Sequence, residues 1–395
     1  MRKPLICIVH RIPYPPNKGD KIRSYNLISR LAQDHDVYLG AFIDDKADHE
    51  HVDKVASLCR ESRFVTITPW VRTLTSCVGL LTGEPLSVRY YRCRAMAAWV
   101  REKLAQHPDA RVYVYSSAMG QFVPADRLPG TVVDFVDVDS DKWEQYSKSK
   151  VFPMNWVYAR EAKTLLKHDV NLATGAAAST FVSTKEADFF TTLASGLKGK
   201  IHAVNNGVDT SFFDPQIDAH QAPIASTPMI CFVGAMDYWA NVEGIQWFVK
   251  EVLPAILTQE PAFKLYIVGS NPGDAVLRLA NDHIVVTGRV EDVRPYVRAA
   301  SVVIAPLRIA RGIQNKVLEA MSMAKPVVAT SMAMEGIAPD HVRVADTAEA
   351  FAASVLALYR QQDDAKLLGA QARSYVEAEF TWSAALDKLA PMLNA

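Results

Sequence analysis

Residues 301–330 combine a spacing and a set of residue types that could bind an anion. The apolar run 302–306 predicts a strand, a glycine-bearing turn follows it, and apolar residues after Lys316 predict a helix leading to a strand at 326–329. Amide groups in the first turn of a helix point outward, and the helix dipole adds positive potential there. We therefore predict a nucleotide-diphosphate site, although an ordinary strand–loop–helix connection has the same local pattern.

Individual residues in this stretch have distinct expected roles. Arg311 and Lys316 would add positive charge beside the anion. Glu319 is an acid in a mostly apolar helix, at a position from which its carboxylate could reach a pair of sugar hydroxyls. The outward-pointing amides would be those of Gly312, Ile313, Gln314 and Asn315.

A second cationic cluster follows the first predicted strand. Gly19 permits a tight turn there, and Asp20 can cap the helix that begins near Lys21. Lys18, Lys21 and Arg23 at this helix entrance favour an anionic ligand, such as a phosphate-bearing acceptor or donor. A solvated basic loop is the alternative. The sequence contains no GxGxxG motif, so we expect no dinucleotide cofactor.

Alternating carboxylates end the predicted strand at 131–136. Side chains two residues apart at a strand end lie on one side, which pairs Asp137 with Asp139. They could bind sugar hydroxyls, hold a metal or act as a base, or they could merely precede a capped helix. We expect no metal, because the acids lack an adjacent histidine ligand. The whole set is Asp134, Asp137, Asp139 and Asp141.

Two helix signals downstream have ordinary interpretations. Ser183 and Glu186 have the spacing of a capping box at the start of a helix. Glu161 lies within the helical pattern 156–168, where we expect it to be exposed.

The segment 69–103 interleaves aromatic and basic residues. An amphipathic basic stretch of this kind can lie at an anionic membrane surface. It can equally form helices that pack on a sheet with their arginines outside. The apolar members include Trp70, Leu74, Val78, Leu80, Leu81, Tyr90, Tyr91 and Trp99, and the cations are Arg72, Arg89, Arg92, Arg94, Arg101 and Lys103.

Length and composition exclude several classes of protein. A chain of 395 residues predicts two or three domains, and its 43 basic and 43 acidic residues cancel, which argues against a nucleic-acid partner. Five cysteines without a CxxC pair indicate a reducing compartment. No apolar window is long enough to span a bilayer, and the apolar run near the first residue is too short for a signal peptide. We therefore expect a cytoplasmic protein.

Continuous apolar strands alternate with helical patterns along the whole chain. Such strands predict parallel sheets covered on both faces, so the fold class is α/β with two doubly wound, Rossmann-like domains. A polar, proline-bearing linker at 214–228 separates them. Ligands bind beyond the carboxyl ends of such strands, so facing domains would hold the site in a cleft between them. The expected strands are 5–9, 37–43, 111–115, 131–136, 180–183, 229–233, 264–268, 284–286, 302–306 and 326–329.

Taken together, these motifs resemble the retaining glycosyltransferases of family four, which have the GT-B fold. The order and spacing of the motifs cover nearly the whole chain. The opening RIPYPPNKGDKIRSYNLISRLA and DFVDVDSDKW are similar to sugar transferases associated with PEP-CTERM/exosortase exopolysaccharide systems. The family motifs are FVSTKEADFF at 181–190, VNNGVDTSFFDP at 204–215, GRVEDVRPYVRAASVVIAP at 288–306 and VLEAMSMAKPVVAT at 317–330.

The resemblance implies how the chain is divided and what each part binds. Residues 1–205, joined by a last helix at about 380–395, would form an acceptor-binding domain. Residues 206–379 would form the nucleotide-sugar-binding domain. The expected reaction transfers a hexosyl group, with retention, from a nucleotide-diphosphate sugar to a saccharide or polyprenyl-linked acceptor. An epimerase of the same fold and a non-catalytic nucleotide-sugar-binding protein are the alternatives.

Family roles carry over to particular positions. Glu319 matches the second of the family's two glutamates, which binds the ribose, whereas Arg311 occupies the position of the first. The loop after Gly234 lacks the family's usual arginine and lysine, so Arg311 and Lys316 are the expected diphosphate partners. Arg289 and Val290 would contact the base.

Overall fold

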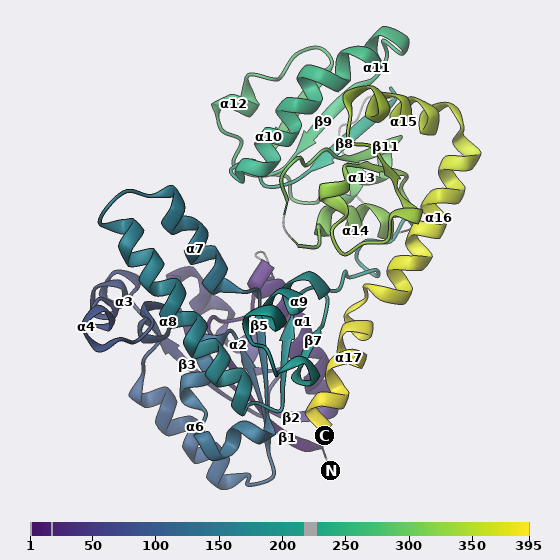
Figure 1. Ribbon diagram of the computed structural model, residues 1–395. Coiled ribbons are helices and arrows are strands. Elements are labelled where there is room, and N and C mark those ends of the chain that lie inside the picture. Colours follow the sequence, from purple (N-terminus) through teal and green to yellow (C-terminus); the bar gives the residue numbers. More distant parts are fainter. Residues whose placement is uncertain (1, 17–18, 217–226, 311, 395) are drawn as a thin grey trace. The chain divides into compact units, whose positions relative to one another are not determined.

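The computed structural model describes residues 2–16, 19–216, 227–310 and 312–394. Two predicted site residues, Lys18 and Arg311, lie outside the described residues. The chain divides into two compact units. The N-terminal unit contains residues 1–205 and 385–395, and the C-terminal unit contains residues 206–384 (Figure 1).

The N-terminal unit is built on a seven-stranded parallel sheet in the order β3-β2-β1-β4-β5-β6-β7. Its central strands are the predicted apolar runs, because a strand with neighbours on both sides and helices on both faces has no polar environment. In β1, for example, Leu5 is opposite Val37 on one side and Arg111 on the other. The strands are β1 (Lys3–Val9), β2 (His35–Ile43), β3 (Glu61–Thr66), β4 (Arg111–Tyr115), β5 (Thr131–Val136), β6 (Ala178–Phe181) and β7 (Ile201–Ala203).

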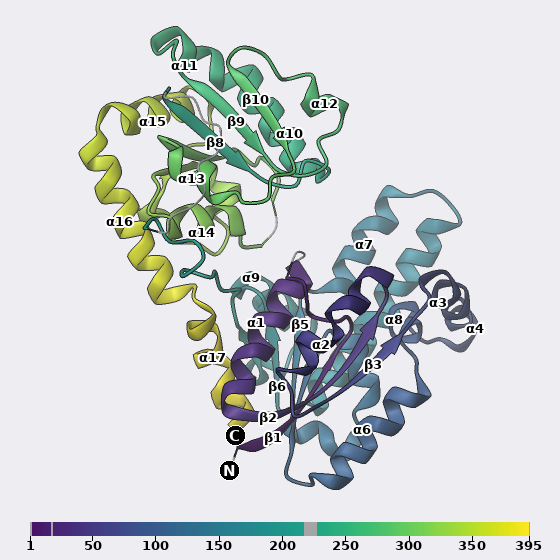
Figure 2. The ribbon, with the colours of Figure 1, turned by 180° about the vertical axis from the view of Figure 1, so that it is seen from behind.

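Helices pack on this sheet at positions set by small residues. Met96 and Trp99 of one helix rest on β2 at Gly40, where a Cβ atom would lie 2.8 Å from the Met96 sulfur. The start of β1 and the end of the last helix lie near each other (Figure 2). The α-helices are α1 (Gly19–Asp34), α2 (Val52–Ala56), α3 (Pro69–Ser76), α4 (Gly79–Thr82), α5 (Leu86–Tyr90), α6 (Arg94–Gln106), α7 (Asp139–Ser149), α8 (Met154–Gly175), α9 (Thr184–Leu193) and α17 (Trp382–Asn394).

The C-terminal unit has a six-stranded parallel sheet in the order β10-β9-β8-β11-β12-β13. Renumbered from its own first strand, this is the 3-2-1-4-5-6 order of Rossmann folds, with its switch point between β8 and β11. The predicted pair of doubly wound α/β domains is therefore confirmed. The strands are β8 (Met229–Val233), β9 (Lys264–Val268), β10 (Ile284–Gly288), β11 (Val302–Ala305), β12 (Val327–Ala329) and β13 (Arg343–Val344).

The helix predicted after Lys316 is α14 (Asn315–Ser322), and it connects β11 to β12. Its apolar face is the predicted one: Val317, Leu318, Ala320 and Met321 are buried. The other α-helices of this unit are α10 (Trp239–Trp247), α11 (Leu253–Gln259), α12 (Asp274–Leu277), α13 (Arg294–Ala299), α15 (Ala348–Arg360) and α16 (Gln362–Glu379).

The described residues offer neither a helix that could span a membrane nor a cluster that could hold a metal ion. No helix among them is both long and apolar enough to cross a bilayer. They also contain no group of three or more His, Cys, Asp and Glu side chains arranged to hold a metal ion.

Candidate active site

The carboxyl ends of β8 and β9 lie side by side in the C-terminal sheet, next to the switch point between β8 and β11. Gly234 follows β8, and its amide donates to the carbonyl of Val268 at 3.0 Å. Gly269 follows β9 with a φ of 155°, and a Cβ atom there would lie 1.7 Å from the Gly234 carbonyl oxygen. Only glycine fits this contact, so the two loops are held together directly above the strand ends.

Lys316, in the first turn of α14, points toward this edge of the sheet. Its ammonium group donates a hydrogen bond to Oδ1 of Asn241 and lies 4.8 Å from the centroid of the Phe232 ring. A Cβ atom on Gly234 would lie 3.1 Å from the Lys316 nitrogen. Asn241 in turn donates to the Ala235 carbonyl at 2.8 Å, which fixes the loop after β8. The structure therefore brings together Lys316 and Gly234, two of the predicted nucleotide-binding residues.

Burial shifts the charges of Lys316 and Glu319 toward neutrality. Desolvation lowers the pKa of Lys316 to about 8, although the nearby Glu319 carboxylate opposes the change. Desolvation likewise raises the pKa of Glu319 to about 7, opposed by Lys316. Perturbed groups at a strand edge are typical of functional sites. An anionic ligand here would meet a poorly hydrated cation whose charge it would stabilise.

The remaining predicted residues of this unit lie around the same edge. Gly312 has a φ of 67°. Gln314 precedes α14, but its side-chain amide does not cap the helix and instead donates to the Gly312 carbonyl at 3.0 Å. A Cβ atom on Gly336 would lie 2.9 Å from Ile313, so this loop packs closely. Arg289 is exposed and Val290 packs on the core. Both follow the edge strand β10, and β9 lies between β10 and β8.

In the N-terminal unit, Asp137 and Asp139 lie together just beyond β5, as predicted. The ammonium group of Lys142 contacts both carboxylates, at 2.8 Å and 2.9 Å. Burial lowers the pKa of Lys142, but the two acids outweigh it and hold that pKa above its ordinary value. The residue before them, Val136, has a φ of 69°, which is strained for a β-branched side chain. Such strain at a strand end is frequent in functional sites.

Known proteins resemble this chain in fold and, over its C-terminal unit, in sequence. Residues 227–361 match the family Glycosyl transferases group 1. A glycosyltransferase from Rickettsia africae is 16% identical with a TM-score of 0.63, over 100% of this chain and 98% of that one. HepE from Anabaena, solved in complex with UDP and glucose, is 15% identical with a TM-score of 0.66, over 99% of each chain. The protein has the GT-B fold.

A third solved structure extends the comparison. An alpha,alpha-trehalose-phosphate synthase (UDP-forming) from Burkholderia vietnamiensis is 13% identical with a TM-score of 0.61, and the match covers 100% of both chains. A search of curated protein sequences found no match. At these identities the likeness of the structures establishes the fold, and the sequence similarity to the group 1 glycosyltransferases covers residues 227–361.

Two residues predicted to bind an acceptor, Lys21 and Arg23, are instead buried in ion pairs. The Lys21 ammonium group contacts Asp48 at 2.7 Å, and both side chains are nearly inaccessible. Arg23 is 1% exposed, and its Nε donates to Asp134 at 2.8 Å. The prediction failed because these cations lie on the inward face of α1 and not on its solvated entrance. Gly19, at the start of that helix, is exposed.

The buried network around Arg23 supports the strained end of β5. Arg23 also donates to the Val204 carbonyl at 2.8 Å, and the Tyr113 hydroxyl donates to Asp134 at 2.8 Å. Glu186 accepts a hydrogen bond from the Val138 amide at 2.7 Å and so ties the β5–α7 loop to α9. Asp134 is therefore structural, whereas Asp137 and Asp139 remain partly exposed.

Sequence reasoning missed a polar cluster at the switch point of the N-terminal sheet. Arg11, just after β1, contacts Asp44 at 2.6 Å and Asp20 at 2.8 Å. His10 lies 3.3 Å from Asp20 and stacks on Tyr115. Burial raises the pKa of Asp20, but His10 and Arg11 more than reverse this and hold it well below its usual range. The signal was present, since charged residues directly follow two predicted strands.

The expected exposure of Glu161 was also wrong. Glu161 is 1% exposed and accepts hydrogen bonds from the amides of Leu86 and Ser87, at 2.7 Å and 2.9 Å. Its carboxylate thus caps α5, a helix far away in the sequence. Ser183, by contrast, caps α9 as predicted, by accepting from the Glu186 amide.

Proposed function

We propose that this protein is a retaining glycosyltransferase. It moves a hexosyl group from a nucleotide-diphosphate sugar to a saccharide or lipid-linked saccharide during exopolysaccharide synthesis, in the cytoplasm. The observation that carries the proposal is the half-buried Lys316, held by Asn241 against Gly234 at the switch point of the C-terminal sheet. The complex of HepE with UDP and glucose supports it, because that protein has the same fold.

In this proposal the C-terminal unit holds the donor. Lys316 and the amides of 312–315 neutralise the diphosphate leaving group, with Arg311 adjacent in the sequence. Glu319 accepts hydrogen bonds from the ribose hydroxyls, and Arg289 and Val290 contact the base. A poorly hydrated cation stabilises charge that develops in the transition state more strongly than a solvated one does. The remaining contribution to catalysis is positioning of the reactants.

The N-terminal unit contributes the groups that meet the sugar. Asp137 and Asp139 are partly exposed, and Lys142 holds them together beyond β5. We assign them to hydrogen bonds with sugar hydroxyls. The reaction requires no enzymic nucleophile in the front-face displacement that the resemblance to retaining transferases implies.

Substitution of Lys316 tests the leaving-group site. Lys316→Ala should cost about 3 kcal/mol in transition-state stabilisation, which is a roughly hundredfold loss in kcat/KM. The matched control is Lys325→Ala, because burial lowers the pKa of that lysine to about 8 too, yet it precedes β12 at the opposite edge of the sheet. The assay measures nucleotide release from UDP-, GDP-, ADP- and dTDP-sugars.

The possible outcomes separate the proposal from its alternatives. Normal turnover by the Lys316 variant would refute the leaving-group assignment. Conversion of the donor to an epimer without any acceptor would identify an epimerase. Donor binding without transfer or hydrolysis would indicate a non-catalytic binding protein.

We also propose that α3 and α4 contact the membrane that carries the acceptor. Trp70, Leu74, Val78 and Leu81 are exposed on successive turns, and Leu81 is 89% exposed. Residues 69–82 contain one charge, that of Arg72. The second half of the segment 69–103 behaves differently, since α6 buries its apolar residues on the sheet. An exposed apolar stripe of this kind fits the acyl boundary of a bilayer.

A second exposed apolar group reinforces the membrane proposal. Val151, Phe152, Met154 and Trp156 are exposed where α7 meets α8. The two groups belong to connected elements, because Arg160 of α8 donates to the carbonyls of Gly79 and Glu84. The lysines Lys148 and Lys150 lie beside the second group in the sequence, which favours anionic lipid.

Vesicle flotation tests this contact. The protein should float with phosphatidylglycerol vesicles at low salt, and the double substitution Trp70→Ser and Leu81→Glu should abolish flotation. Leu367→Glu is the matched control, because Leu367 is also largely exposed but belongs to the C-terminal unit. Absence of flotation by the unaltered protein at low salt would remove the proposal.

A further inference from the structure

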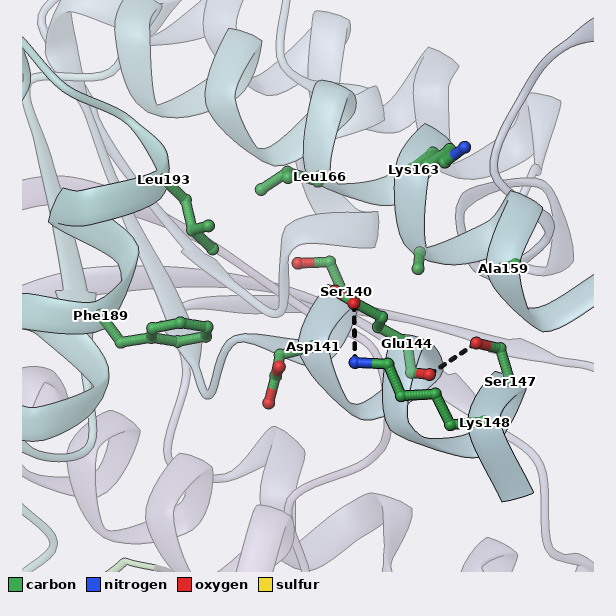
Figure 3. A pocket seen from close by; sticks show the side chains of 11 residues that line it. Ser140, Asp141, Glu144, Ser147, Lys148, Ala159, Lys163, Leu166, Phe189 and Leu193 are labelled. Atoms are coloured by element: carbon green, nitrogen blue, oxygen red, sulfur yellow. Dashed lines mark hydrogen bonds and ion pairs between the residues drawn. The ribbon is translucent and has the colours of Figure 1, made fainter.

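A cavity of about 300 Å³ lies in the N-terminal unit between α7, α8 and α9. Its inner wall is apolar, with Leu166, Phe189 and Leu193 around it, and its rim is polar (Figure 3). The volume is at the lower end of the range for small-molecule sites. The full lining is Ser140, Asp141, Glu144, Ser147, Lys148, Ala159, Ala162, Lys163, Leu166, Phe189 and Leu193.

A buried hydroxyl without a partner is directed at this cavity. Ser140 is 4% exposed, and its Oγ has no hydrogen-bond partner among the described residues. Figure 3 shows this hydroxyl pointing toward the space that Leu166, Phe189 and Leu193 surround. Buried polar groups in folded proteins are nearly always hydrogen-bonded. The unpaired hydroxyl therefore indicates a ligand whose polar group forms the missing hydrogen bond.

The rim offers hydrogen-bonding groups of both kinds. Glu144 contacts Lys148 at 2.9 Å, and the Ser147 hydroxyl donates to the Glu144 carbonyl at 2.6 Å. Asp141 lines the same side, and Lys163 of α8 is also among the lining residues. The two carboxylates are balanced by Lys148 and Lys163, so these residues give the rim no net positive charge that would attract a phosphate. They suit a neutral ligand with many hydroxyl groups.

We propose that this cavity binds one saccharide unit of the acceptor chain. The apolar face of a sugar ring would lie against Phe189, which is 37% exposed. Its hydroxyls would bond to Ser140, Asp141 and Glu144. Ser140 directly follows Asp139 in the first turn of α7, so a chain seated here would extend toward the acids assigned to the reacting sugar. This inference rests on the proposed function, which makes the acceptor a saccharide.

Binding to simple glycosides tests the proposal. The probes are methyl glycosides of glucose, galactose, mannose and N-acetylglucosamine, with their disaccharides, observed by saturation-transfer NMR. Ala159→Trp fills the cavity and should weaken binding of the best probe roughly tenfold or more. Ser140→Ala should weaken it less. Lys167→Trp, which adds the same side chain to α8 at a residue that does not line the cavity, should bind as the unaltered protein does.

The outcomes distinguish failure of this site from failure of the proposed function. Circular dichroism first establishes that each variant is folded. Probe affinity unchanged in Ala159→Trp, or no probe bound by the unaltered protein, overturns the cavity proposal. A missing thermal shift with every nucleotide sugar would instead overturn the proposed function, even where glycosides bind the cavity.

Discussion

At the scale of single residues, Lys316 and Glu319 carry opposite charges that burial disfavours. In the ligand-free protein they act in opposite directions on stability. Because the pKa of Glu319 is raised, the free energy of unfolding falls as pH rises through about 7. Because the pKa of Lys316 is lowered, the free energy of unfolding rises as the pH increases from about 8 toward the ordinary pKa of lysine.

Nucleotide binding should therefore have a narrow pH optimum. Above about pH 8 Lys316 loses its charge, and below about pH 7 Glu319 becomes protonated and accepts hydrogen bonds less well. We expect the affinity for UDP, measured by calorimetric titration across this range, to be highest between the two values. Glu319→Gln should remove the decline on the acid side and move the alkaline decline to lower pH, because the carboxylate no longer opposes the lowering of the Lys316 pKa. A flat profile in the unaltered protein would contradict the assignment of both residues.

The buried pair of Arg23 and Asp134 makes a separate prediction about stability. Arg23→Ala leaves a carboxylate that is fully buried without its cation, and this should cost about 3–5 kcal/mol. Urea denaturation measures the loss. Arg30→Ala, on the same helix and with an exposed hydrogen bond to Gln33, should cost less than about 0.5 kcal/mol. Equal losses in the two variants would show that the pair is not what stabilises α1.

At the scale of elements, the junction between β8 and β9 depends on Gly269. Gly269→Ala combines a φ of 155° with an overlap against the Gly234 carbonyl, so it should cost about 3 kcal/mol or more and abolish UDP binding. Gly273→Ala, four residues further on, has open space and an ordinary φ of −76° and should change little. Thermal melting and UDP titration measure both effects. Full UDP affinity in the Gly269 variant would place the nucleotide elsewhere.

Strand prediction succeeded in the sheet interiors and missed three of the four edge strands among the described residues. The missed strands β3, β7 and β13 are all edge strands. An edge strand pairs on one side only, so it needs no continuous apolar run; β3 reads ESRFVT and is partly exposed throughout. The short strands β7 and β13 consist of three and two residues, too few for a recognisable period.

At the scale of the whole molecule, each unit has a separate apolar core. The core residues of one unit lie between positions 6 and 201, and those of the other between 208 and 380. Two cores predict two transitions in calorimetric unfolding. UDP at about 100 times its Kd should stabilise one transition by about 2.7 kcal/mol and leave the other unchanged. Lys316→Ala should remove that shift, and a ligand effect on both transitions would contradict a donor site confined to one unit.

The sequence by itself determined the α/β class, the two parallel sheets and the glycine-bearing turn before α14, because buried strands and helix faces leave periodic apolar patterns. It also placed Gly234 and the Asp137–Asp139 pair at strand ends, and Lys316 at the start of the helix that follows the strand at 302–306. Only the tertiary structure decided which charges face inward. Lys21, Arg23 and Glu161 look solvated in the sequence, yet each is neutralised by a partner far along the chain. Local spacing carries no record of such partners, since the fold alone brings them together.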